Sequence, residues 1–294
     1  MASAPRRVWF DQGCEAFKRT RPDLALQVPW EHFYVCPLCL HAFNEEALTS
    51  RQLTLEHVPP QSVGGTRLAL TCKACNSGSG AQVDNHMKRE AHVHEFAVGN
   101  LKEIKATIQT ASGEAPVRVA VSGSNILMFG VPAATHPDVH KNVMGDFESA
   151  SVGDGWQDFE FKLQFPEFSS KRAASSWLRS AYLAFFSTLG YHFIFRQELG
   201  FVRRRIQNPE DDEPATARIL RPETSEPMLI RIDSPATFRS YAMLYGPNVV
   251  FLPRYNDCGL YDRLAEHPET RVKFSGIQYP WPVGGPTFFH DRPR

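Results

Sequence analysis

Two pairs of cysteines place the strongest constraint on how this chain can fold. Cys36-Pro37-Leu38-Cys39 and Cys72-Lys73-Ala74-Cys75 both have the spacing C-x-x-C. Two such pairs can supply four thiolates to one tetrahedral zinc ion. Zinc coordination releases about 10–16 kcal/mol in small metal-folded domains, which is comparable with the whole folding free energy of a domain, about 5–15 kcal/mol. We therefore expect a structural zinc site. Four thiolates leave zinc no open position, so the chemistry must use other residues.

The remaining composition favours a protein of a reducing compartment. Six cysteines in 294 residues are too few for a disulfide scaffold, and four of them lie in the two pairs. Cys14 and Cys258 are left over, and we expect them to be buried free thiols. No run of about 18 apolar residues occurs, and the first residues lack the apolar core of a signal peptide. We expect a soluble, cytoplasmic protein without a membrane segment.

The charge balance limits how nucleic acid could be bound. The chain has 32 basic and 32 acidic residues and a net charge of zero, so a polyanion site must be a local patch. Residues 171–205 are the most cationic segment, with seven basic residues and one acid. This segment is either a solvated helix face or a patch that faces phosphates. The second interpretation makes Arg203, Arg204 and Arg205 nucleic-acid contacts.

The length suggests about two domains, and the patterns predict an α+β protein. We expect a leading arm at residues 1–30, a domain held together by the zinc ion (the zinc-clipped domain) at 31–110 and a C-terminal α+β domain at 111–294. Residues 83–108 have a mostly helical pattern, and residues 110–116 are the best candidate for a linker. Alternating apolar residues predict strands on both sides of this segment.

One helix is predicted more clearly than any other. Apolar residues recur at helical spacing from Trp177 to Leu189 in one broad stripe, and Gly190 follows in the position of a C-terminal cap. The helix is expected at residues 170–189, and its apolar stripe is expected to belong to the core.

An acid, a base and an amide lie between and beside the two cysteine pairs. Glu56 and His57 are consecutive in Leu55-Glu56-His57-Val58-Pro59-Pro60, and Asn76 directly follows the second pair. A neutral histidine can take a proton from water near pH 7, and carboxylate and amide oxygens suit Mg²⁺ or Mn²⁺. Neighbours on a strand point to opposite faces, so Glu56 and His57 can share one site only if the strand ends or bulges there. Val58-Pro59-Pro60 is expected to end it.

These residues resemble the HNH endonuclease family. The resemblance rests on five spaced elements over about residues 31–95: Cys36-x-x-Cys39, Glu56-His57-x-x-Pro60, Gly64-Gly65, Cys72-x-x-Cys75-Asn76, and Gly80 with Asp84. It implies a ββα-metal fold, in which two strands and a helix hold one catalytic divalent ion, and DNA as substrate, with RNA as a further option. The middle asparagine of the family falls at Arg67, and no asparagine lies between His57 and Asn76.

The resemblance also implies roles for individual residues. His57 is the base that activates water, Glu56 and Asn76 are ligands of the catalytic Mg²⁺ or Mn²⁺, and Asp84 is a supporting residue or an extra ligand. Apart from the resemblance, Arg67 is either a phosphate contact or simply exposed, and Lys73 is a candidate phosphate contact. His86 is either a metal or phosphate contact or a surface or capping residue.

These observations lead to one main hypothesis and two alternatives. The main hypothesis is a divalent-metal-dependent endonuclease that cuts or nicks DNA, with a C-terminal domain that positions substrate, dimerises or regulates. By family analogy it would be a defence or mobile-element effector. The first alternative is an inactive zinc-clipped module that binds DNA or RNA, which Arg67 favours. The second is a nuclease gated by a small-molecule-sensing C-terminal domain, which releases the nuclease when it recognises its signal. A low activity that rises when the chain is cut near Ser112-Gly113 would support it.

Overall fold

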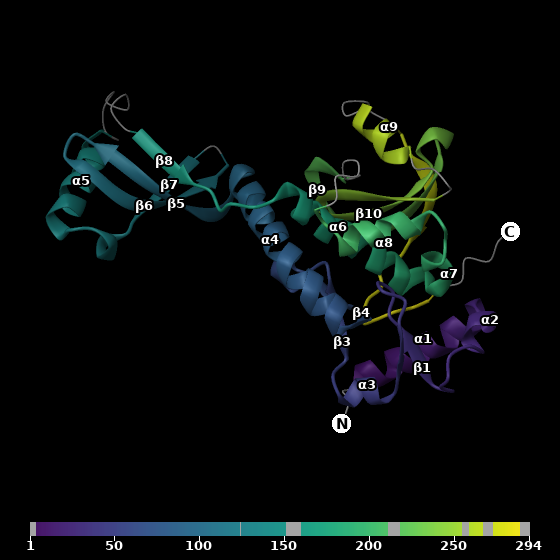
Figure 1. Cartoon of the computed structure of the whole chain (residues 1–294). Coiled ribbons are helices and arrows are strands. Elements are labelled where there is room, and N and C mark those ends of the chain that lie inside the picture. The colour runs from purple at the N-terminus through teal and green to yellow at the C-terminus, as the bar shows by residue number, and fades with distance from the viewer. Residues whose placement is uncertain are drawn as a thin grey trace. The chain divides into compact units, whose positions relative to one another are not determined.

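The chain forms an α+β structure with two compact units. The computed structural model describes residues 4–123, 125–150, 160–210, 218–254, 259–266 and 273–288. Unit 1 consists of residues 1–87 and 169–294, and unit 2 consists of residues 88–168 (Figure 1). This division by packing cuts the chain at other places than the predicted divisions at residues 30 and 110. Among the helices that the structure describes, none has the length and apolar character needed to cross a bilayer.

The first part of unit 1 consists of short elements. β1 pairs with β2 and β3 pairs with β4, both antiparallel, and a π-helical turn at Ala74–Ser79 leads from β4 into α4. The leading arm is a helix with buried Trp9, Phe10 and Phe17, so it packs on the domain. The elements are α1 (Ala4–Thr20), α2 (Pro22–Ala25), β1 (Phe33–Val35), β2 (Ala42–Asn44), α3 (Glu46–Thr49), β3 (Leu53–Val58), β4 (Thr66–Cys72) and α4 (Gly80–Ala97).

The loop from β3 to β4 depends on two glycines. Gly64 has φ +88°, a conformation that costs glycine least. A Cβ on Gly65 would lie 1.5 Å from the carbonyl oxygen of Pro59, so only glycine fits. The strand β3 ends at Val58, as the following prolines predict. The Gly-Gly pair therefore fixes how the chain returns from Glu56-His57 to the second cysteine pair.

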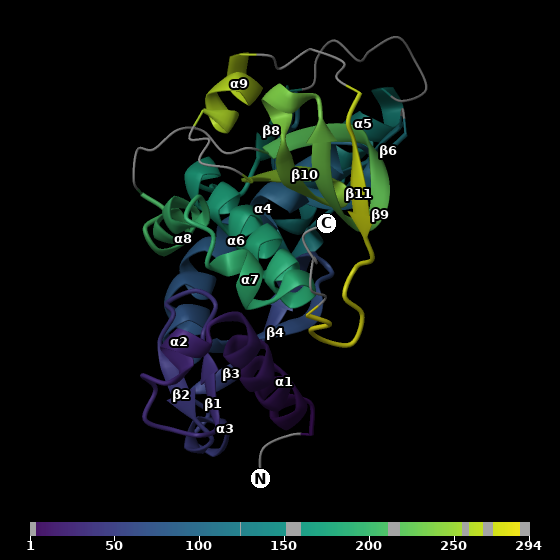
Figure 2. The same cartoon turned by 90° about the vertical axis from the view of Figure 1, so that its right-hand side faces the viewer.

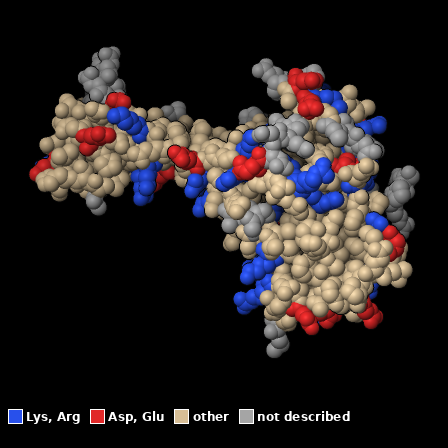
Figure 3. Space-filling view, viewed as in Figure 1, with Lys and Arg blue, Asp and Glu red and all other residues tan. Residues whose placement is uncertain are grey.

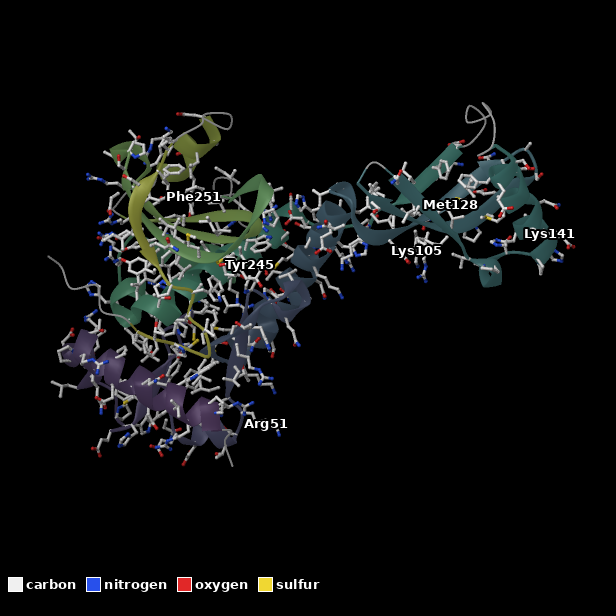
Figure 4. The ribbon with its side chains drawn as sticks, turned by 180° about the vertical axis from the view of Figure 1, so that it is seen from behind. Arg51, Lys105, Met128, Lys141, Tyr245 and Phe251 are labelled. Atoms are coloured by element: carbon white, nitrogen blue, oxygen red, sulfur yellow. The ribbon has the colours of Figure 1, made fainter. Side chains whose placement is uncertain are left out.

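The second part of unit 1 places one long helix below a three-stranded sheet. The sheet has the order β10-β9-β11, and α6 contacts β10 on one side and β3 and β4 on another (Figure 2). Figure 4 labels Tyr245 and Phe251 on β10; the Tyr245 ring lies 6.3 Å from that of Trp177 on α6. The elements are α6 (Ser170–Leu189), α7 (Tyr191–Ile194), α8 (Leu199–Gln207), β9 (Arg218–Ser234), β10 (Ser240–Pro253), α9 (Leu260–Glu266) and β11 (Ser275–Tyr279).

Helix α6 has the predicted bounds, but it is buried on every side. All residues from Ala173 to Leu189 are buried, although only one apolar stripe is predicted. Several of its polar positions are small hydroxyls that donate to carbonyls, such as Ser187 to Leu68 at 2.8 Å and Thr188 to Ala184 at 3.1 Å. Buried hydroxyls with such partners cost little. Gly190 caps the helix with φ +73°.

Unit 2 is an antiparallel sheet with one covering helix, and it corrects two predictions. Its strand order is β7-β6-β5-β8, and Val143 of α5 packs into its core with Ile104 and Val119. The predicted helix at 83–108 is wrong beyond Ala97, because Gly99 (φ +80°) breaks it before β5. The elements are β5 (Asn100–Thr110), β6 (Gly113–Ser122), β7 (Asn125–Gly130), α5 (Pro137–Ala150) and β8 (Glu160–Gln164).

The predicted linker at residues 110–116 is also wrong. Thr110 pairs with Gly113 across a two-residue turn, and Pro116 lies within β6 opposite Thr107. The backbone N–H of Ser112 donates to Asp146 at 3.0 Å. Small and polar residues are common in tight hairpin turns as well as in linkers, so composition alone does not separate the two.

Candidate active site and zinc centre

The four paired cysteines form one cluster. Their Sγ atoms all lie within 4.8 Å of one another, and the Cys39 and Cys72 sulfurs are 3.7 Å apart. Tetrahedral zinc with Zn–S bonds of about 2.3 Å separates its sulfurs by about 3.8 Å, so the cluster fits zinc. Cys36 and Cys72 are buried. Burial raises the pKa of the Cys36 thiol, and a bound divalent cation opposes this because it stabilises the thiolate.

The other two cysteines lie outside this cluster or outside the described residues. The Cys14 thiol is buried, as predicted, and donates to the Glu31 carbonyl at 3.8 Å. Cys258 lies outside the described residues. In the described part of the chain, the thiolate cluster is the sole group of three or more histidine, cysteine or acidic side chains that could hold a metal ion.

Glu56 and His57 lie at an irregular point of the β3–β4 ladder. Glu56 pairs with Ala69 and His57 pairs with Arg67, so Leu68 is an extra residue on β4 and forms a bulge. A bulge changes the local strand direction and is common beside active sites. The extra residue lies on β4, and β3 continues to Val58, so a single site served by both Glu56 and His57 stays a prediction.

The Glu56 carboxylate is buried between two donors. It is 4% exposed; Thr71 donates to one oxygen at 3.1 Å, and Arg179 of α6 contacts the other at 2.9 Å. Burial raises the pKa of Glu56 to about 6, and the positive charge of Arg179 opposes that rise. Because the pKa stays below 7, the carboxylate is mostly ionised at neutral pH.

Asn76 is joined to the same strand pair. It directly follows the second cysteine knuckle (Cys72–Cys75; the first knuckle is Cys36–Cys39) and lies in the π-helical turn. Its Nδ2 donates to the Thr54 hydroxyl at 2.8 Å. Thr54 lies two residues before Glu56 on β3, so both side chains are on one face, and its hydroxyl is 3.3 Å from the Thr71 carbonyl. The Thr54–Thr71 pair therefore links Asn76 to Glu56. The hydrogen bond to Thr54 leaves the Oδ1 of Asn76 as its acceptor atom.

Asp84 on α4 completes this group. Ser176 of α6 donates to its carboxylate at 2.6 Å, and the Arg179 guanidinium lies 3.7 Å away. Burial raises the pKa of Asp84, and Arg179 again opposes the rise. The predicted residues Glu56, Asn76 and Asp84 are thus connected to one another, through partners that the sequence did not predict.

His57 is the least constrained of the predicted site residues. It is half-buried, and its imidazole makes no hydrogen bond to the described part of the chain. Burial lowers the pKa of His57, and the positive charge of Arg67 lowers it further. Neutral imidazole is therefore the dominant form at pH 7, and this form can accept a proton.

The predicted nucleic-acid contacts are not all exposed. Arg67 and Lys73 are exposed, and so is Arg204. Arg205 is buried and Arg203 donates to the hydroxyl of Tyr182 at 3.3 Å, so the expected joint patch of Arg203, Arg204 and Arg205 is wrong. Successive helix residues point about 100° apart, so three in a row cannot share one surface. In Figure 3, basic side chains occur in separate groups on the face shown.

Arg179 and His86 both have specific contacts within the protein. Arg179 is buried at the site described above, where the sequence predicted either surface or phosphate contact. His86 accepts a hydrogen bond from the backbone N–H of Ser169, the N-cap residue of α6, at 2.9 Å. This hydrogen bond matches the capping role that the sequence left open for His86.

Comparison with known proteins agrees with this geometry. Residues 36–92, about a fifth of the chain, match the family model of the HNH endonuclease. The N-terminal region contains an HNH domain. Its two strands β3 and β4, helix α4 and the thiolate cluster lie within the matched residues or at their margin. No curated protein and no solved structure matches the chain. The HNH domain supports a hydrolase that acts on nucleic acid.

The zinc assignment predicts the effect of removing one ligand. Cys36→Ser should lower the zinc content of the purified protein from one ion per chain to near zero and unfold the HNH domain, because a four-thiolate site supplies folding free energy. Elemental analysis and thermal unfolding measure both effects. Cys14→Ser is the matched control, since this thiol lies outside the cluster, and it should keep its zinc. A Cys36→Ser protein that keeps one zinc would refute the assignment.

Proposed function

We propose that the HNH domain is a divalent-metal-dependent endonuclease that cuts or nicks DNA by hydrolysing phosphodiester bonds. The observation that carries the proposal is the network that joins Glu56, Asn76 and Asp84, with His57 next to Glu56 on β3. Hydrolysis of a phosphodiester needs a base for water and a cation for the phosphate. The site has a candidate for the first and oxygen ligands for the second.

In this proposal His57 is the general base. Its imidazole is half-buried, has no hydrogen-bond partner in the described part of the chain, and has a lowered pKa. These properties leave a neutral ring nitrogen able to accept the proton of an attacking water. A positioned base contributes about 10²–10⁴ to the rate of such a step.

Glu56 and Asn76 would hold the catalytic Mg²⁺ or Mn²⁺, with Asp84 as a supporting residue or further ligand. The donor set fits a hard cation, because it consists of two carboxylates and an amide oxygen. When bound, the ion neutralises charge on the scissile phosphate and assists the leaving oxygen. The zinc ion of the thiolate cluster is proposed to be structural, because four cysteines fill its coordination shell.

Arg67 and Lys73 are proposed as phosphate contacts. Both are exposed, Arg67 lies opposite His57 in the strand ladder, and Lys73 lies within the second knuckle. Exposed cations of this kind bind the nucleic-acid backbone without reading its sequence. Arg204 is a further exposed cation, on α8.

A binding module without hydrolysis is the second candidate. Arg67, in the place of the middle asparagine of the family motif, favours this alternative. Such a module would keep the zinc-bound fold and the exposed cations and lose only the chemical step. The two candidates differ in whether His57 matters for turnover.

A plasmid-nicking assay in Mg²⁺ or Mn²⁺ separates the two candidates. His57→Ala is expected to lower the nicking rate by about 10²–10⁴ while DNA binding and zinc content are kept. His41→Ala is the matched control, because His41 is an exposed histidine beside the first knuckle and should leave the rate unchanged. If wild type and His57→Ala both bind DNA and neither cuts it, the binding module is the correct function.

The salt dependence of DNA binding tests the phosphate contacts. The double variant Arg67→Ala, Lys73→Ala should flatten the slope of log K against log salt by about 2, since each lost phosphate contact contributes about 0.9. Lys105→Ala, Lys141→Ala removes the same charge from exposed positions of unit 2 (both labelled in Figure 4) and should not change the slope. Equal slopes for both double variants would remove Arg67 and Lys73 from the interface.

A further inference from the structure

Two side chains of α6 reach the proposed ion ligands. Ser176 donates to Asp84 at 2.6 Å, and Arg179 lies 2.9 Å from Glu56 and 3.7 Å from Asp84. The two residues are three positions apart, so they lie on one face of the helix. Arg179 also donates to the Cys75 carbonyl at 3.3 Å, next to Asn76. One helix face therefore contacts all three elements that carry a proposed ligand: β3, the π-helical turn and α4.

Burial defines what Arg179 can do. Its side chain is 3% exposed, so the guanidinium cannot touch a nucleic-acid substrate in this arrangement. Its guanidinium lies 2.9 Å from the Glu56 carboxylate and 3.7 Å from that of Asp84, so it contacts both proposed carboxylate ligands. Arg179 therefore acts on the site through the carboxylates.

The group of Glu56, Asp84 and Arg179 lowers the stability of the fold if it serves packing alone. Two buried or partly buried carboxylates and a guanidinium are often replaceable by apolar side chains without loss of stability. In addition, the Nε of Arg179 is buried and has no acceptor in the described part of the chain, which is unfavourable. Local costs of this kind are expected at functional sites.

We propose that Ser176 and Arg179 are positioning residues of the divalent-ion site, holding Asp84 and Glu56 in place to receive the ion. The inference rests on the proposed function and adds to it: the HNH domain does not complete its own site. Hydrogen-bonded partners of metal ligands orient those ligands, and their loss lowers metal affinity by about 10–100-fold. Here these partners come from a helix that begins 78 residues beyond the end of the matched segment, at Ser170.

Ser176 and its neighbour Ser175 on α6 supply a test of the positioning role and its control. Ser176→Ala in the full-length, zinc-loaded protein should weaken Mn²⁺ binding by about 10-fold, measured by calorimetry and by the electron paramagnetic resonance of bound Mn²⁺. Ser175→Ala is the matched control: Ser175 is buried on the same helix, its hydroxyl has no hydrogen-bond partner in the described part of the chain, and its variant should bind Mn²⁺ as wild type does.

The arginine supplies a second, independent test. Arg179→Met should weaken Mn²⁺ binding by about 10–100-fold, and Arg179→Lys should restore part of the affinity because it keeps the charge and loses the fork. Zinc content, measured on the same samples, should stay at one ion per chain. Ser176→Ala keeps the test decisive if Arg179→Met does not fold.

The outcomes separate this inference from the proposed function. If wild type binds no Mn²⁺ and does not cut DNA, the proposed function fails. If wild type binds Mn²⁺ and both Ser176→Ala and Arg179→Met bind it equally well, the positioning role fails and the function stands. Tighter binding by Arg179→Met would also overturn the inference, because it would mean that the guanidinium competes with the ion.

Discussion

The burial of helix α6 is the constraint on which the rest of unit 1 depends. The strand pairs β1–β2 and β3–β4 are too small to be stable alone, because two-stranded sheets are marginal in water. α6 supplies the apolar surface that they need: Phe185 and Phe186 are fully buried in the core that also contains Leu53 and Leu68. The same core continues into β10, so α6 joins the HNH strands to the C-terminal sheet.

Polar contacts make this packing specific. Tyr182 of α6 donates to the Pro37 carbonyl at 3.0 Å, and Tyr191 donates to the Val35 carbonyl at 2.6 Å. Gln207 of α8 donates to the Leu38 carbonyl at 2.9 Å. The backbone of the first knuckle thus finds its donors on helices from the second half of the chain. The proposed zinc ion would join the two knuckles to each other, and these helices fix the first knuckle to the core.

Much of this structure could be predicted from the sequence, because its signals are local. The four-cysteine spacing, the strand that ends before Pro59 and the bounds of α6 all follow from short patterns. The same patterns predicted a linker at residues 110–116 where the structure has a hairpin turn, because the two have similar composition. Helix rotation also contradicts the joint patch of Arg203, Arg204 and Arg205.

Arg179 shows why the complete site could not be predicted. A single arginine in an apolar helix usually marks the solvent side, and its partner Glu56 is far away in sequence. Only the tertiary packing of α6 against β3 brings the two together. Glu56 was a weak signal for such a partner, because a carboxylate that is buried in a strand needs a cationic side chain beside it. Nothing in the sequence identifies which side chain that is.

Anomalous diffraction from crystals soaked in Mn²⁺ tests the account most directly, because zinc and manganese are distinguished by their absorption edges. We expect a zinc peak among the four cysteine sulfurs and a separate manganese peak at oxygens of Glu56 and Asn76, with Ser176 and Arg179 still in contact with Asp84 and Glu56. A manganese site away from Glu56 and Asn76, or no manganese at all under conditions in which the protein cuts DNA, would contradict it.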